Sequence, residues 1–245
     1  DRLIAIGSPV FSVVDWNTFA HIPIEQHLSK KDNIQPIYGV EIPILTYDDE
    51  GELNPFKPRA WILADDLKSF YHASTKSAKN GGLTPDEFGE LTGVVRFPGG
   101  ALHLLDVDQY DYIDVNPASV VQAFAGVQKA RETGWPLVVT SFNDMPKIED
   151  ASNAYAWEVR DSVGLRTLEL PSVMWDKALK YVMDEEEFGD ALINTLGVAA
   201  RLAGRKLNKA PIIHLDGDLV KLARDGQAYR LKMGQIKEWT QVYED

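Results

Sequence analysis

The 245-residue sequence contains no cysteine, which excludes disulfide bonds, thiolate zinc sites and cysteine nucleophiles. It also lacks a signal-peptide pattern and any run of about eighteen apolar residues, so we expect a soluble, cytoplasmic protein without a membrane anchor. The phosphate-binding loop of nucleotide hydrolases, the G-x-S-x-G nucleophile elbow and the dinucleotide-binding fingerprint are absent too. These absences remove several common classes of enzyme and leave a metal site or a binding role to consider.

Basic charge is scarce as well. The sequence has 37 acidic against 25 basic residues, a formal net charge of −12. Binding of nucleic acid over the whole surface needs Lys and Arg to neutralise phosphates, so only a local basic groove could serve that purpose. The length is sufficient for an α/β barrel, or for one domain with a small appendage.

The segment from Gly7 to Glu41 is the most informative. An apolar run at residues 10–14 ends at Asp15, and a second run at residues 35–40 ends at Glu41. Two buried strands joined by a helical crossover form a parallel pair, and functional side chains gather at the carboxyl ends of such strands. We therefore expect Asp15 and Glu41 to face a common site.

Further elements follow from periodicity and from capping signals. We expect a strand at residues 60–63, a helix that begins after Asp65 or Asp66 and runs to Ala78, and a buried strand at residues 135–140. An amphipathic helix is predicted over residues 117–133. Its expected apolar face consists of Val120, Val121, Phe124 and Val127.

A last well-marked helix should begin after Asp184, which can form a capping box with Glu187. Its expected packing face consists of Phe188, Leu192, Leu196, Ala199 and Ala203. Helical periodicity returns over residues 219–245.

The order of these segments resembles the PHP (polymerase and histidinol phosphatase) domain that begins bacterial family C replicative polymerases, the DNA polymerase III alpha subunits. Residues 7–41 follow that family's G-M-P-A-L-A-I-T-D-H-G-N-L, helix and I-K-P-I-I-G-C-E without a gap. Residues 59–64 resemble its H-L-V-L-L-A, residues 93–100 its G-L-I-A-L-S-G-C, and residues 194–201 its E-N-T-L-E-I-A-E-R.

The resemblance implies an α/β fold, a distorted (β/α)7-type PHP barrel at residues 1–183. Residues 184–245 would be a helical C-terminal appendage that resembles the connection to a polymerase palm. The chain starts inside the helix that precedes G-M-P in the family, so we expect the barrel to lack its first strand.

The resemblance also implies a metal site that has lost most of its ligands. PHP sites hold divalent cations with His and carboxylate ligands, and these cations activate water. Asp15 and Glu41 match ligating positions, and Asp144 is a possible substitute at a third. The remaining matched positions hold Trp16, Arg59, Gly100 and Phe142. We expect no cofactor, or Mg²⁺ or Mn²⁺ held only weakly.

Arg59 occupies the position of a ligating His, which suggests what took the place of the metal. A guanidinium would neutralise carboxylates that otherwise repel one another. We expect Arg59 to form an ion pair with Glu41 or Asp15. An alternative cation site is offered by His103 or His214, each close to two acids, although capped turns account better for both patterns.

The resemblance favours a catalytically degenerate module associated with DNA replication, with no catalytic residue and with a replicative polymerase or another replication protein as partner. Two alternatives stay open. One is a metal-dependent phosphoesterase or 3′–5′ exonuclease that uses Asp15, Glu41 and Asp144, with help from His103. The other is an acidic interaction protein that binds a host or viral replication partner.

Overall fold

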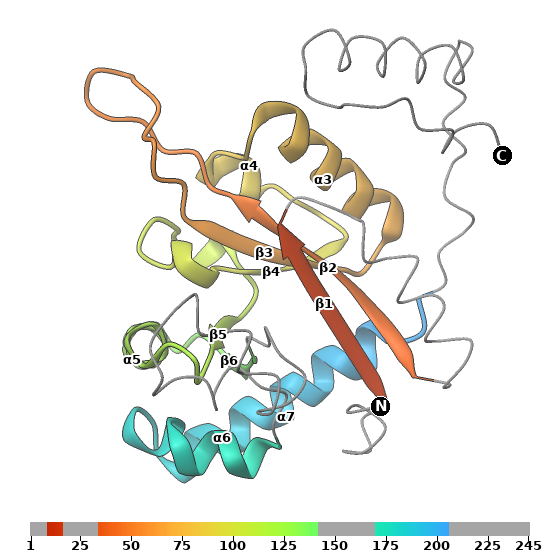
Figure 1. Ribbon diagram of the computed structural model, residues 1–245, viewed down its shortest axis with the longest axis vertical. Helices are drawn as coiled ribbons and strands as arrows, with labels where there is room; N and C mark the ends of the chain where they lie inside the picture. The colour runs from red at the N-terminus through yellow and green to blue at the C-terminus, as the bar shows by residue number, and fades with distance from the viewer. Residues whose placement is uncertain (1–8, 17–33, 142–169, 206–245) are drawn as a thin grey trace, which may run out of the picture. The chain divides into compact units, whose positions relative to one another are not determined.

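The computed structural model describes residues 9–16, 34–141 and 170–205, all within one compact unit, Asp1–Arg205 (Figure 1). The fold is mixed α/β. The described strands form a four-stranded sheet and a two-stranded sheet. An α/β fold is thus confirmed, and the closed PHP barrel stays a prediction.

The four-stranded sheet contains β1 (Val10–Trp16), β2 (Gln35–Pro43), β3 (Arg59–Ala64) and β4 (Val94–Phe97), in that order. β1 and β2 are parallel, as the sequence predicts, whereas β3 is antiparallel to both of its neighbours. The predicted crossover helix between β1 and β2 lies outside the described residues. Because two antiparallel steps restore the direction, β1, β2 and β4 all end on the same side of the sheet.

The two-stranded sheet pairs β5 (Ile113–Val115) with β6 (Leu137–Val139) in parallel. Two hydrogen bonds link β4 and the turn after it to β5 and the residues before it. The Asp111 N–H donates to the Arg96 carbonyl, and the Gly99 N–H donates to the Asp114 carboxylate, both at 2.9 Å. In both bonds the two residues are separated by the same number of positions in the sequence. A step forward along β4 therefore matches a step forward along β5, and the two strands run in the same direction. The carboxyl ends of β2, β4, β5 and β6 therefore share one side.

Five α-helices are described: α3 (Leu67–Asn80), α4 (Pro85–Gly89), α5 (Val120–Thr133), α6 (Pro171–Lys177) and α7 (Glu185–Leu202). Three short 3₁₀ helices are η1 (Gly99–Ala101), η2 (Val107–Gln109) and η5 (Leu179–Tyr181). The predicted start of α3 is confirmed, since the Asp66 carboxylate accepts the Ser69 N–H. Within these ranges no helix combines the length and the apolar character needed to cross a bilayer.

The packing face of α5 differs from the prediction. Val120, Val121 and Phe124 are 47%, 81% and 52% exposed, and of the four predicted residues only Val127 is buried. The small residues Ala123, Gly126 and Ala130 pack inward instead. A Cβ on Gly126 would lie 3.1 Å from Ile113 Cγ2, so α5 approaches β5 too closely for a larger side chain.

α7 begins with the predicted capping box of Asp184 and Glu187, but its packing face is also different. Leu196 is 69% exposed, whereas Ala191, Val198 and Leu202 are buried. Polar bonds set this rotation. Asn194 Nδ2 donates to the Leu137 carbonyl at 2.9 Å, and the Val139 N–H donates to Thr195 Oγ1 at 2.8 Å.

α7 completes the core of the compact unit. Its residues Val198 and Leu202 lie in one apolar cluster with Ile37, Leu63, Val95, Phe97 and Val138. These partners come from β2, β3, β4 and β6, so the helix that the sequence assigns to an appendage packs together with both sheets. Burial of aliphatic side chains of this size stabilises a fold by about 1.5–3 kcal/mol each.

Candidate functional site

β2 and β3 place Glu41 and Arg59 side by side. The antiparallel register pairs Glu41 with Trp61 and Pro43 with Arg59, so the two charged residues are diagonal neighbours. Arg59 Nη1 donates to Glu41 Oε2 at 3.1 Å, with the side chains 46% and 22% exposed. The ion pair expected for Arg59 and Glu41 is therefore present. Its role as a replacement for a metal ion stays a prediction.

The other predicted acids are placed only in part. In the parallel ladder Asp15 is in register with Val40, and Trp16 is in register with Glu41. The backbone of Asp15 therefore lies beside the residue that precedes Glu41 on the neighbouring strand. The side chains of Asp15 and Trp16 lie outside what the structure describes, as do Asp144, Phe142 and His214.

Asp114 on β5 belongs to the same region, and sequence reasoning missed it. Its carboxylate accepts the Gly99 N–H at 2.9 Å. Burial raises the pKa of the Asp114 carboxyl, and the nearby negative charge of Glu41 acts in the same direction. The bonds from the Gly99 N–H and the Trp61 side chain oppose this rise in pKa by favouring the ionised form. The negative charge of Glu41 therefore acts on the Asp114 carboxyl.

The turn after β4 fits tightly against β3. Gly99 has φ +50°, and a Cβ there would lie 2.7 Å from the Arg59 carbonyl oxygen, so this position requires glycine. Gly100, which the PHP resemblance would match to a ligating Cys, is less crowded. Its nearest neighbour would be the same oxygen at 3.7 Å. The fold thus brings Glu41, Arg59, Gly100 and Asp114 together at the carboxyl ends of β2, β4 and β5.

Aromatic rings form one wall of this region. Trp61 stacks on Phe97 with ring centroids 3.8 Å apart and an interplanar angle of 5°. Tyr112 continues the row, with its ring 6.0 Å from that of Phe97. One face of Trp61 is therefore occupied by an intramolecular stack. This stack gives Trp61 a packing role and holds it beside Asp114.

The chemistry available at this region is that of a charge-balanced carboxylate site. Within the described ranges, no group of three or more His, Cys, Asp or Glu residues is arranged to hold a metal ion. His103 is exposed, and the neighbouring Asp106 caps η2 in a capping box with Gln109, as expected of a capped turn. Guanidinium and carboxylate groups at this spacing can bind and neutralise one another.

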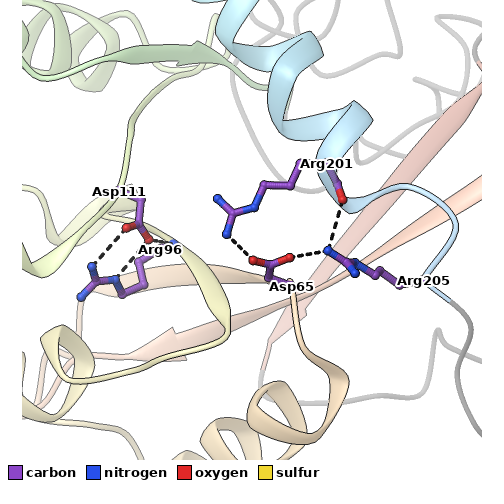
Figure 2. Close-up of polar contacts among 5 residues, drawn as sticks. All are labelled: Asp65, Arg96, Asp111, Arg201 and Arg205. Atoms are coloured by element: carbon purple, nitrogen blue, oxygen red, sulfur yellow. Dashed lines mark hydrogen bonds and ion pairs between the residues drawn. The ribbon is translucent and has the colours of Figure 1, made fainter.

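A second set of ion pairs has a structural role (Figure 2). Asp65, at the end of β3, accepts hydrogen bonds from Arg201 and Arg205, one on each carboxylate oxygen. Arg96 of β4 binds both oxygens of Asp111, at 3.2 and 3.1 Å. The first set ties the end of α7 to the turn between β3 and α3. The second ties β4 to the segment before β5.

No protein-family model matches the sequence, and no curated protein matches it either. The resemblance to the PHP domain therefore stays a prediction that rests on the order of motifs along the chain. The geometry of Glu41, Arg59 and Asp114 is independent of it.

Proposed function

We propose that the chain is a catalytically degenerate PHP-like module that serves DNA replication as a structural or partner-binding part of a polymerase III alpha-like system. The observation that carries the proposal is the bond from Arg59 to Glu41. In the PHP resemblance these positions belong to a ligating His and a ligating Glu, and here a guanidinium binds the carboxylate directly.

A guanidinium and a divalent cation compete for the same carboxylate. Ligand oxygens approach Mg²⁺ or Zn²⁺ to about 2.0–2.2 Å, and a permanently charged arginine bound to the same oxygens would be repelled by the ion. Arg59 Nη1 lies 3.1 Å from Glu41 Oε2, which leaves no room for an ion between them.

A metal-dependent phosphoesterase or 3′–5′ exonuclease is the second candidate. Asp114 is the observation in its favour, because it places another carboxyl group within electrostatic reach of Glu41. With Asp15, which the sequence places at the end of β1, these acids would supply the oxygen ligands that Mg²⁺ and Mn²⁺ prefer.

Metal retention separates the two candidates. The full chain is equilibrated with Mn²⁺, Zn²⁺ and Mg²⁺, the excess is removed, and metal per chain is measured. A degenerate module retains none, and an Asp15→Ala, Glu41→Ala double variant behaves identically. Retention of an ion that the double variant loses would refute the proposal and support the phosphoesterase.

Arg59→Ala adds a sharper comparison, because removal of the guanidinium leaves Glu41 without its ion-pair partner. We expect this variant to bind Mn²⁺ more tightly than the wild type in a titration. The matched control is Arg131→Ala. Arg131 pairs with Glu187 at 2.7 Å, with side-chain exposures of 45% and 24%, close to the 46% and 22% of Arg59 and Glu41. Equal gains in both variants would show a general effect of charge.

Association with a polymerase is tested by affinity purification of the full chain from the cells in which it is naturally expressed. Recovery of a replicative polymerase subunit in a fixed ratio is the expected result. Recovery of an unrelated protein in that ratio would favour the acidic interaction protein instead.

A further inference from the structure

α7 has one long face that the described residues leave uncovered. Ile193 and Leu196 on it are 66% and 69% exposed. Gly197 and Ala200 on the same face are also exposed, and a Cβ on Gly189 or Gly197 would meet no atom within 4 Å. At 100° per residue these positions form a single stripe, opposite the side chains that pack on β6.

The two glycines have no packing reason within the described part of the chain. Glycine weakens a helix interior relative to alanine, and it is tolerated there where another backbone or side chain approaches closely. No backbone or side chain of the described residues lies within 4 Å of a Cβ placed on Gly189 or Gly197. The exposed isoleucine and leucine project from the helix, and each neighbouring glycine leaves a depression in its surface. Two such helices can pack with the projecting side chains of one in the depressions of the other.

Charge is distributed unevenly along the same face. Glu185, Glu186 and Asp190 are exposed on its amino-terminal half and form no ion pair with another side chain of the described ranges. Arg201 is 53% exposed near the carboxyl end. A helix that is acidic at one end and basic at the other complements a second copy of itself in the antiparallel orientation, and it repels a parallel copy.

We propose that α7 is the contact surface of a symmetric homodimer, in which two copies of the helix pack antiparallel across this stripe. In a pair centred on Thr195, Ile193 lies level with the second copy's Gly197, and each isoleucine fills the depression over the other copy's glycine. The second copy's Arg201 then lies within one helical turn of both Glu186 and Asp190. The same patch serves on both copies, as a two-fold axis requires.

The two-fold arrangement follows from the pattern of residues. In this pair the two Leu196 positions are offset by only about 3 Å along the helix axis, so their side chains meet at the centre of the contact. The remaining donors of Arg201 stay available, because its recorded bond to Asp65 uses a single nitrogen, Nη2. The overall charge of −12 opposes association, so we expect the dimer to dissociate as the protein concentration falls.

The test measures molar mass of the full chain by analytical ultracentrifugation over a concentration series from about 1 to 500 μM. The mass is expected to rise from one chain to two and to stop there. Gly197→Leu fills the depression and should hold the mass at one chain, with dimer affinity at least about tenfold weaker. Leucine favours the helix, so the melting temperature of this variant should not fall, and unfolding cannot explain the loss.

A charge-exchange experiment tests the antiparallel orientation. The Glu186→Lys, Asp190→Lys variant and the Arg201→Glu variant should each fail to dimerise alone, because like charges then face each other. Mixed in equal amounts they should form a heterodimer, since both contacts become attractive. Val121→Asp, on the exposed face of α5, should leave the wild-type dimer intact.

Three results would overturn the proposal. They are a wild-type mass of one chain at every concentration, a dimer that survives Gly197→Leu, and a dimer broken by Val121→Asp. Failure of the mixed variants to associate would overturn the antiparallel arrangement. None of these outcomes depends on metal content or on a polymerase partner.

Discussion

Replacement of Asp114 by asparagine should stabilise the protein at neutral and alkaline pH. Burial raises the pKa of the Asp114 carboxyl, and the charge of Glu41 adds to the rise, so the folded state accommodates the ionised form less well than the unfolded chain does. The asparagine side chain keeps an oxygen that can accept the Gly99 N–H, and it carries no charge. The Asp114→Asn variant therefore removes the cost of ionisation and retains the bond from the Gly99 N–H.

The sign and size of the effect follow from proton linkage. Below the ordinary Asp pKa of about 3.9 the group is protonated in both states, and the two proteins should be equally stable. As the pH rises, the unfolded wild type releases its proton while the folded protein keeps it. The wild type then loses up to about 1.4 kcal/mol per pH unit relative to the variant. The loss stops once the folded group has also ionised, so the advantage of the variant reaches a plateau.

Urea unfolding followed by tryptophan fluorescence measures this difference. The pH range is 5.5 to 8.5, above the sequence pI of about 4.9, where solubility is lowest. The Asp114→Asn variant should have the larger free energy of unfolding at pH 8.5, and its advantage should be no greater at pH 5.5. A variant that is no more stable than the wild type at pH 8.5 would refute the reasoning.

Asp66→Asn provides a control of opposite sign. Hydrogen bonds from the side chain and backbone of Ser69 lower the pKa of the Asp66 carboxyl. Its stabilising contribution is present above the ordinary Asp pKa and is lost as the pH falls through the folded pKa. The Asp66→Asn variant should therefore be less stable than the wild type across the measured range. A general effect of removing negative charge would stabilise both variants.

Three further predictions concern stability. Arg59→Ala and Arg131→Ala should each lower the free energy of unfolding by about 0.2–1 kcal/mol in urea titrations, because half-exposed ion pairs contribute little, and a loss above about 2 kcal/mol in either would contradict this. Thr195→Val should cost about 1–3 kcal/mol, since it leaves the Val139 N–H without its acceptor, and faster amide exchange of Val139 would identify the cause. Asp184→Ala should cost about 1 kcal/mol through loss of the amino-terminal cap of α7, whereas Asp184→Asn should restore most of it.

Local sequence signals predicted most of the secondary structure. Strand β3, helix α3, the capping box of α7 and the parallel pairing of β1 with β2 were all predicted, because each depends on residues close in sequence or on alternation within one strand. The pair of Arg59 and Glu41 was also predicted, from the positions of the two residues in a resemblance.

The packing faces of helices could not be predicted in the same way. Periodicity favours large apolar residues, and it chose Val121 and Phe124 for the buried side of α5. Close contact with β5 admits only small side chains there, and Gly126 is the residue that fits. The rotation of α7 is set by two hydrogen bonds to β6, one donated by Asn194 to the Leu137 carbonyl and one accepted by Thr195 from the Val139 N–H. The periodicity of apolar residues does not reveal these polar contacts.

Asp114 was missed for a related reason. It lies in a three-residue strand, too short to show an alternating pattern, with buried Ile113 and Val115 on either side. An acid between two apolar residues was the only local sign. Its bonding partners Gly99 and Trp61 are distant in sequence, so the site forms only when β3, β4 and β5 come together.

Asn194 and Thr195 take the place of a neighbouring strand along the edge of β6 that faces α7. Their side chains form hydrogen bonds with the Leu137 carbonyl and the Val139 N–H. A shortened protein that stopped at Met183 would leave that side open. Open strand edges recruit strands from other molecules and lead to aggregation. Insolubility of such a fragment would therefore reflect a missing helix and would say nothing against the fold of the remaining residues. A soluble fragment of the compact unit should extend to Arg205.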